Sequence, residues 1–235
     1  FKLEQALEHY QKAAKLDPKN FNARLNLLRT NNSLGQNLRD NGAERKVTET
    51  YFKKNVELAE ALYRDFPNRA EASFSVAIAY GNLALYSTSK EKVRLSRDIE
   101  KNLKRAIELD PKFPYSYLGL GIFYREVSKI TFLERFFAKL LFGDIPKATL
   151  VDALHHFELA VKGDPNFLFT RYHYALTLMD MDDVQAASVQ FQKVISLPET
   201  DSGDARLKTL ARKALAEIQE DYPAILIDQQ GSAAP

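Results

Sequence analysis

Apolar positions along the chain recur every three or four residues, in runs that are broken in similar ways. The phrases at the breaks read KLDPKN at 15–20, ELDPKF at 108–113 and KGDPNF at 162–167. Proline cannot continue a helix and restricts the residue before it, so each phrase marks the end of one helix and the start of the next. The pattern therefore predicts an all-α fold, an α-α superhelix built from repeated helical hairpins.

Two sets of helices follow from this periodicity. First helices of the hairpins are expected at 20–38, 69–87, 113–130 and 167–180, and second helices at 2–16, 45–65, 90–109, 149–162 and 183–196. A further helix at 203–221 has one apolar stripe and one charged face, as the capping end of a solenoid requires. We predict one solenoid domain over 1–221, with four to five hairpins, and a C-terminal tail over 222–235.

The spacing of small and aromatic residues is that of the tetratricopeptide (TPR) repeat. A first helix of this repeat carries Leu-Gly followed by Tyr, and a second helix carries Ala, then Phe, then a closing Pro. Residues 120–124 match the first half and residues 153–165 match the second. The prolines Pro67, Pro111 and Pro165 lie farther apart than the 34-residue period of the repeat. The hairpins are therefore expected to be lengthened and to carry insertions.

Small residues mark the places where helices of a hairpin should approach closely. Ala77, Gly121 and Ala175 occupy one equivalent position in successive first helices. A glycine inside a helix costs about 1 kcal/mol relative to alanine. Gly121 therefore predicts a contact with a neighbouring helix that leaves no room for a side chain.

One insertion, ITFLERFFAKLLFG at 130–143, predicts an amphipathic helix at 130–142. Its apolar face consists of Leu133, Phe136, Phe137, Leu140 and Leu141. Such a helix can touch a membrane surface or close over a ligand. Alternatively, it packs on the solenoid and covers a bare face. We favour the packed arrangement, because aromatic residues this dense are usually buried.

The segment around this insertion, residues 123–167, resembles the TPR domain of the regulator of microtubule dynamics family. The matching positions are Leu133, Glu134, Arg135, Leu141, Phe142, Gly143, Pro146, Ala148, Thr149, Ala153, Leu154, Phe157, Ala160 and Pro165. Phe132 stands where the family has tryptophan, and the first 60 residues match only as degenerate repeats. The resemblance implies an all-helical, non-catalytic adaptor. It also implies links to microtubules and to organelle contact sites, including lipid handling.

The ligand-binding surface of a TPR solenoid is the concave side, which the first helices line. In this register the lining residues are Phe74, Ile78, Tyr115, Leu118, Ile122, Phe169, Tyr172, Leu176 and Met179. A row this apolar suits an amphipathic helix, an apolar segment or a lipid chain. The sequence is compatible with an open groove and with a groove that the insertion fills.

The charged residues and the residues that could act as catalytic groups or metal ligands indicate little about function. The net charge is +2, which is too balanced to indicate nucleic-acid binding. Lys101, Lys104 and Arg105 lie on a basic helix that could meet an anionic lipid surface or an acidic protein, although a solvated outer face explains it more simply. The chain has no cysteine and no nucleophile or phosphate-loop motif. We expect no catalytic residue, no metal site and no cofactor.

Two classes of function remain, a scaffold that binds a protein or peptide partner and a binder of lipid or another hydrophobic ligand. The chain opens at Phe1 inside a helical pattern and without methionine. We therefore expect a processed or trimmed N-terminus that could have carried a signal or an anchor. This favours a soluble domain that is exported, periplasmic or membrane-anchored over a cytoplasmic one. The sequence leaves the oligomeric state undetermined.

Overall fold

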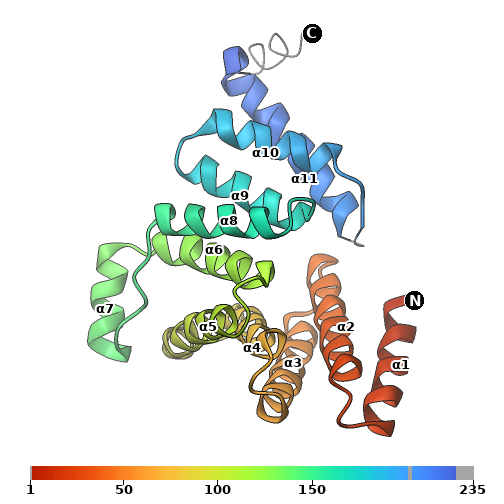
Figure 1. The fold of residues 1–235 in the computed structure, drawn as a ribbon. Helices are drawn as coiled ribbons and strands as arrows, with labels where there is room; N and C mark the ends of the chain where they lie inside the picture. Colours follow the sequence, from red (N-terminus) through yellow and green to blue (C-terminus); the bar gives the residue numbers. More distant parts are fainter. Residues whose placement is uncertain (1, 201–202, 226–235) are drawn as a thin grey trace. The chain divides into compact units, whose positions relative to one another are not determined.

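The computed structural model describes residues 2–200 and 203–225, and in these residues it contains helices and no β-strand (Figure 1). The helices are α1 (Lys2–Leu16), α2 (Phe21–Asp40), α3 (Arg45–Asp65), α4 (Ala70–Ala84), α5 (Ser89–Leu109), α6 (Pro114–Ser128), α7 (Phe132–Phe142), α8 (Leu150–Gly163), α9 (Leu168–Asp180), α10 (Val184–Ser196) and α11 (Asp204–Asp221). Their bounds agree with the predicted ones to within three residues. The prediction of an all-α fold is confirmed.

Side-chain caps fix several helix starts. Thr88 with Glu91, Thr131 with Glu134 and Thr149 with Asp152 form capping boxes at the starts of α5, α7 and α8. In each box the threonine hydroxyl accepts from the third backbone N–H and the carboxylate accepts from the threonine N–H, so two otherwise unpaired donors are satisfied. These hydrogen bonds also lower the pKa values of the three carboxyl groups.

The chain divides into two compact units. The first comprises residues 1–119 and 131–146, and the second comprises residues 120–130 and 147–235. Helix α6 therefore contributes its first turns to one unit and the rest to the other. The single solenoid domain predicted over 1–221 stays a prediction, and residues 226–235 of the predicted tail lie outside the described residues.

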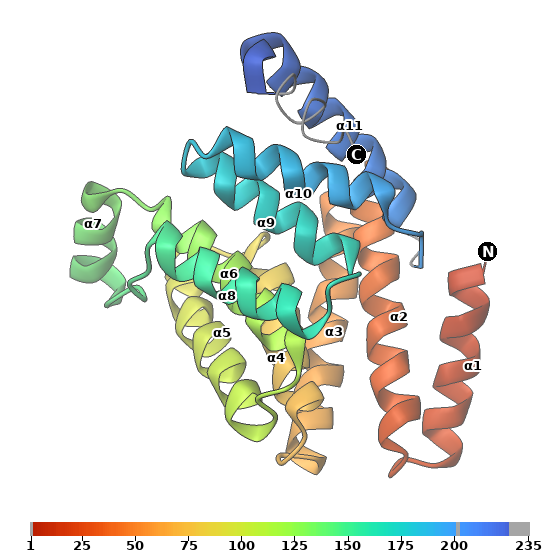
Figure 2. The same cartoon turned by 45° about the horizontal axis from the view of Figure 1, so that its top comes forward.

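In the first unit, α1 to α5 pack in succession, each against the next, as Figures 1 and 2 show. Phe21, Leu25, Leu62 and Val76 belong to a core shared by α2, α3 and α4. Helix α7 lies against α5. This order of contacts is the one that stacked helical hairpins produce.

The same three helices share a polar network. Asn31 donates to the side chain of Asn55 at 3.1 Å, and Asn55 donates to Asn32 at 3.1 Å. Asn82 of α4 also donates to Asn32, at 2.7 Å. Because Asn55 is fully buried, these bonds satisfy amide groups that have no access to water.

In the second unit, α8 packs on α9, α9 on α10 and α10 on α11. Phe157, Phe191 and Ala187 are fully buried there. The terminal helix α11 buries Ala211 and Ile218 against this core. The periodicity predicted an apolar stripe at these positions of the helix, and the structure buries it.

Candidate binding surfaces

In the first unit, the predicted lining residues belong to an aromatic cluster. Phe74 of α4 packs edge-on against Phe113, with ring centroids 5.5 Å apart, and Phe113 packs against Tyr115 at 5.3 Å. Phe74, Ile78 and Tyr115 are partly buried, so each keeps some surface exposed to solvent. Leu118 is only 5% exposed. Its side chain is therefore part of the protein interior and is not accessible from solvent.

In the second unit, the lining residues lie mainly along α9. Phe169 is 37% exposed, and its ring centroid lies 4.4 Å from that of His173. Tyr172 packs against the buried Phe191 at 5.8 Å. Ile122, Leu176 and Met179 are partly buried. Phe169 is thus the most accessible of these side chains.

A polar group borders this row. Arg125 Nε of α6 donates to Asp180 Oδ2 at 2.6 Å, and Lys129 Nζ lies 3.3 Å from the same oxygen. The buried Nδ1 of His173 has no hydrogen-bond partner among the described residues. Burial, together with the cations Arg125 and Lys129, lowers the pKa of His173 to about 4. The imidazole is therefore neutral at pH 7.

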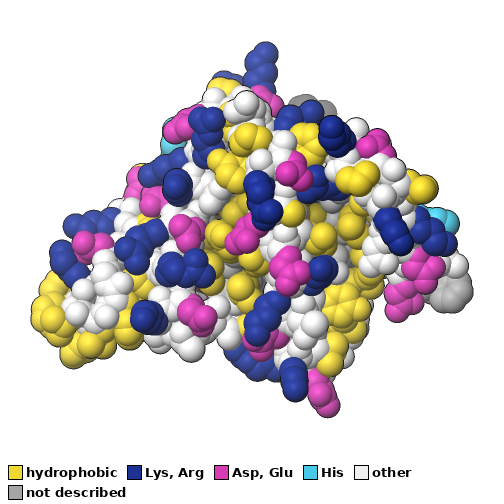
Figure 3. Space-filling view, turned by 90° about the horizontal axis from the view of Figure 1, so that it is seen from below, with side chains coloured by type: hydrophobic (Ala, Val, Ile, Leu, Met, Phe, Trp, Pro, Cys, Tyr) yellow, Lys and Arg dark blue, Asp and Glu magenta, His cyan; other side chains and the backbone are white. Residues whose placement is uncertain are grey.

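The insertion helix α7 exposes its apolar face. Phe132, Leu133, Phe136, Phe137, Leu140 and Leu141 are all between 50% and 85% exposed. Figure 3 shows hydrophobic side chains gathered at the left edge of the view, where α7 lies. The prediction that this face is packed on the solenoid is therefore wrong. The residues of α7 that are partly buried are Arg135, Ala138 and Phe142, on the opposite side of the helix.

The predicted basic face lies on α5. Lys101 and Lys104 are exposed, and Arg105 is partly buried. Lys104 Nζ pairs with Glu100 at 2.7 Å, and Arg105 Nη1 pairs with Glu108 at 3.1 Å. The helix carries seven Lys or Arg and four Asp or Glu, so its side chains have a net charge of +3.

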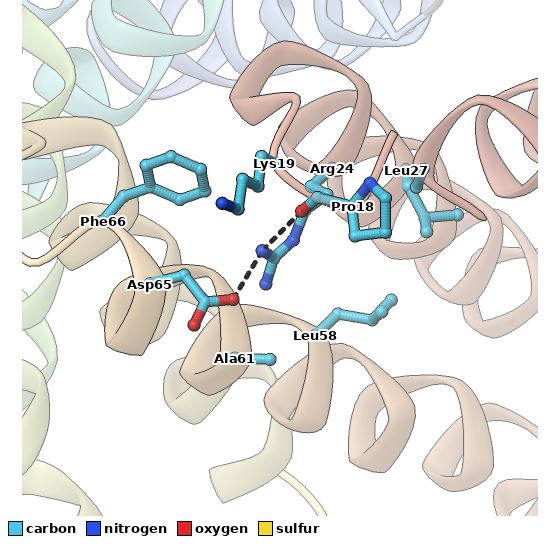
Figure 4. A pocket seen from close by; sticks show the side chains of 9 residues that line it. Pro18, Lys19, Arg24, Leu27, Leu58, Ala61, Asp65 and Phe66 are labelled. Atoms are coloured by element: carbon cyan, nitrogen blue, oxygen red, sulfur yellow. Dashed lines mark hydrogen bonds and ion pairs between the residues drawn. The ribbon is translucent and has the colours of Figure 1, made fainter. Parts of the chain in front are cut away.

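A cavity that the sequence did not predict lies between α1, α2 and α3 (Figure 4). Its volume is about 690 Å³, and its walls include Ala14, Leu27, Leu58 and Ala61. At its rim, Arg24 Nη1 donates to Asp65 Oδ2 at 2.6 Å and to the carbonyl of Pro18 at 3.0 Å. Arg24 and Asp65 therefore pair with each other, and the remaining walls of the cavity are mainly apolar.

Side chains that could act as metal ligands or catalytic groups form hydrogen bonds with the helix backbone. His156 Nδ1 lies 2.7 Å from the carbonyl oxygen of Asp152, one turn before it in α8. Asp183 accepts from the N–H of Ala186 and caps α10, as its place in a helix–helix turn predicts. In the part of the chain that the structure describes, no three His, Cys, Asp or Glu side chains are placed to hold a metal ion. In the same part, no helix is long and apolar enough to cross a membrane.

Comparison with known proteins gives consistent matches. The family described as regulator of microtubule dynamics protein 1-3 matches residues 22–219, and the TPR repeat matches residues 2–27. The human regulator of microtubule dynamics protein 2 is 25% identical over 163 residues, which are 69% of this chain and 40% of that protein. The Caenorhabditis elegans regulator of microtubule dynamics protein 1 is 28% identical over 150 residues, which are 63% of this chain and 66% of that protein.

A solved structure shows the same fold. A thermophilic TPR protein of Thermus thermophilus aligns with a TM-score of 0.67 at 18% identity, covering 91% of each chain. The predicted TPR fold is therefore confirmed. The chain spans only about two fifths of the length of the human relative, so the activity of that whole protein does not follow for this chain.

Proposed function

We propose a function from the premise that this chain belongs to the regulator of microtubule dynamics protein 1-3 family: it is a non-catalytic adaptor that binds a partner polypeptide through its first helices. A TPR fold in this family supports a role in protein interaction. The finer assignment, to the apolar side chains of the first helices, is our inference.

The observation that carries this proposal is the aromatic surface of α9. Phe169 is 37% exposed and rests on His173, a ring that stays uncharged at neutral pH. An accessible aromatic ring on a rigid helix loses little conformational entropy when it binds, and such residues dominate binding energies. The bordering cations Arg125 and Lys129 are already paired with Asp180, so the surface itself is apolar rather than charged.

The lack of catalysis is also part of the proposal. His156 and Asp183 are engaged in helix hydrogen bonds, and Asp180 is engaged in ion pairs. A nucleophile, a base and an oxyanion donor within reach of one point would be needed for acyl transfer. The engagement of these three side chains in other contacts supports a non-catalytic role.

The test is affinity capture from an extract of the source cells with the wild-type chain and with Phe169→Glu. A charge at the centre of an apolar contact should remove the bound polypeptide. Val189→Glu is a matched control, because Val189 of the second helix α10 is 39% exposed and its replacement introduces the same charge. Equal capture by all three proteins would refute the assignment to the first helices.

The second candidate is a lipid or another hydrophobic ligand bound by first helices in place of a polypeptide. The apolar character of Phe74, Ile78 and Tyr115 favours it, since these side chains are partly exposed in the first unit. Native mass spectrometry of gently purified protein separates the two candidates. A co-purified small-molecule mass that disappears in Phe74→Glu would favour the ligand, whereas a bare chain mass together with capture of a polypeptide would favour the adaptor.

A further inference from the structure

The most apolar exposed surface of the described residues is the outer face of α7. Six large side chains project from about half of the circumference of this helix, from Phe132 to Leu141, and each is at least half exposed. The opposite side, with Ala138 and Phe142, faces the protein. Helix α7 thus contacts the protein through its less apolar side. Burial of apolar surface during folding favours the opposite orientation, with the more apolar side against the protein.

Local contacts close both ends of α7. Its start is closed by the capping box of Thr131 and Glu134, and its end is closed by Gly143 at φ +99°, a conformation that favours glycine. Behind it, Arg135 Nη1 donates to the carbonyl of Pro146 at 2.9 Å. The outward apolar face therefore belongs to a helix that is capped at both ends.

A row of basic residues reaches the end of this helix. Lys90, Arg94, Arg97, Lys101 and Lys104 recur every three or four residues along α5 and are all exposed, so they form one stripe. Arg97 lies at the junction, because a Cβ added at Gly143 would be 3.5 Å from its Nη1. Helices α5 and α7 pack against each other within the first unit. Figure 3 shows Lys and Arg side chains next to the hydrophobic patch.

Part of this basic charge is uncompensated. Arg94 and Lys104 pair with Asp98 and Glu100. Lys90, Arg97 and Lys101 form no ion pair with the residues that the structure describes. Their charge is therefore available to an external anionic surface.

We propose that the apolar face of α7 and the basic stripe of α5 dock together on the surface of an anionic lipid bilayer. A helix of this kind lies in the plane of the membrane with its apolar face at the boundary between headgroups and acyl chains. Each Lys or Arg near an anionic surface adds attraction that falls off within a Debye length. This docking does not depend on the proposed adaptor function, which concerns the first helices.

The experiment is flotation of the purified chain with vesicles. The wild type should float with mixed phosphatidylcholine–phosphatidylserine vesicles at low salt, much less at high salt, and not with pure phosphatidylcholine. Phe136→Ser combined with Leu140→Ser should weaken binding on the order of 100-fold, because two apolar side chains lose their burial. Replacing Lys90, Arg97 and Lys101 by glutamate should weaken it by a similar factor on the order of 100-fold.

Matched controls separate this surface from general effects. Val47→Ser with Leu85→Ser removes two exposed apolar side chains elsewhere in the same unit, and glutamates at Lys2, Lys12 and Lys15 reverse three exposed charges of α1. Both controls should bind like the wild type. Far-UV circular dichroism should show unchanged helicity in all variants, because every changed residue is exposed.

Three results would overturn the proposal. The wild type could fail to float with anionic vesicles, or it could bind neutral vesicles equally well. Alternatively, analytical ultracentrifugation could show an oligomer that Phe136→Ser with Leu140→Ser converts to a monomer. In that case the face of α7 is covered by a second copy of the chain.

Discussion

Gly121 of α6 lies directly against the ring of Phe157 of α8. A Cβ atom at Gly121 would come within 3.0 Å of three ring carbons, and Phe157 is fully buried. The ring therefore has little room to withdraw. This contact explains why a helix interior contains a glycine despite its cost to helix formation.

The first prediction concerns this contact. Gly121→Ala should lower the free energy of unfolding by about 1 kcal/mol or more, because overpacking a buried ring exceeds the gain in helix propensity. Gly81→Ala is the matched control, since Gly81 also lies inside a helix, α4, but nothing lies within 4 Å of its added Cβ. It should raise the free energy of unfolding by about 0.5–1 kcal/mol. Urea unfolding followed by circular dichroism measures both changes in the free energy of unfolding. Changes of the same sign in the two variants would contradict the close approach of Gly121 and Phe157.

The second prediction concerns the asparagine network of the first unit. Asn55→Ala removes the side chain that accepts from Asn31 and donates to Asn32. The free energy of unfolding should fall by about 2 kcal/mol, since buried amide groups lose partners that water cannot replace. Asn22→Ala, at an exposed position of α2, should change it by less than about 0.5 kcal/mol. Similar losses in both variants would show that the network contributes nothing specific.

The third prediction concerns the pH dependence of stability in the second unit. The pKa of His173 is about 4 in the folded protein, against about 6.5 for an unfolded histidine. Between these two pKa values, His173 is protonated in the unfolded chain but not in the folded protein. The stabilisation present above about pH 6.5 is therefore lost as the pH falls towards 4.

The measurement compares wild type and His173→Gln at pH 7.5 and pH 5.0. On lowering the pH, the wild type should lose about 2 kcal/mol more of its free energy of unfolding than the variant. Arg125 of α6 and Lys129, just beyond the end of α6, oppose protonation, and Asp180 of α9 is paired with both. The same pH slope in both proteins would show that His173 titrates normally.

Much of the fold could be predicted from the sequence because its signals are local. Pro18, Pro111 and Pro165 each lie in a short connection, where one helix has ended and the next is about to begin. The threonine at 149 and the aspartate at 152 also form a capping box that is readable in the letters alone. Gly121 indicated a close helix contact, which the structure confirms with Phe157.

The binding surfaces were less predictable, because periodicity shows that a helix has an apolar face but not what that face meets. The face of α7 was expected to be buried, and Phe136 and Leu140 are exposed instead. Leu118 was placed with the lining residues by register, yet it is buried. The cavity at Leu27 and Leu58 arises from three helices together and leaves no mark in any one segment.

The fourth prediction tests the central claim that the first helices bind a partner polypeptide. Once a captured partner is purified, isothermal titration calorimetry gives its dissociation constant for wild type, Phe169→Glu and Val189→Glu. Phe169→Glu should weaken binding at least about 30-fold, as the loss of a central aromatic contact does, while Val189→Glu should stay near the wild-type value. Equal affinities for all three proteins, or equal losses in both variants, would contradict the account.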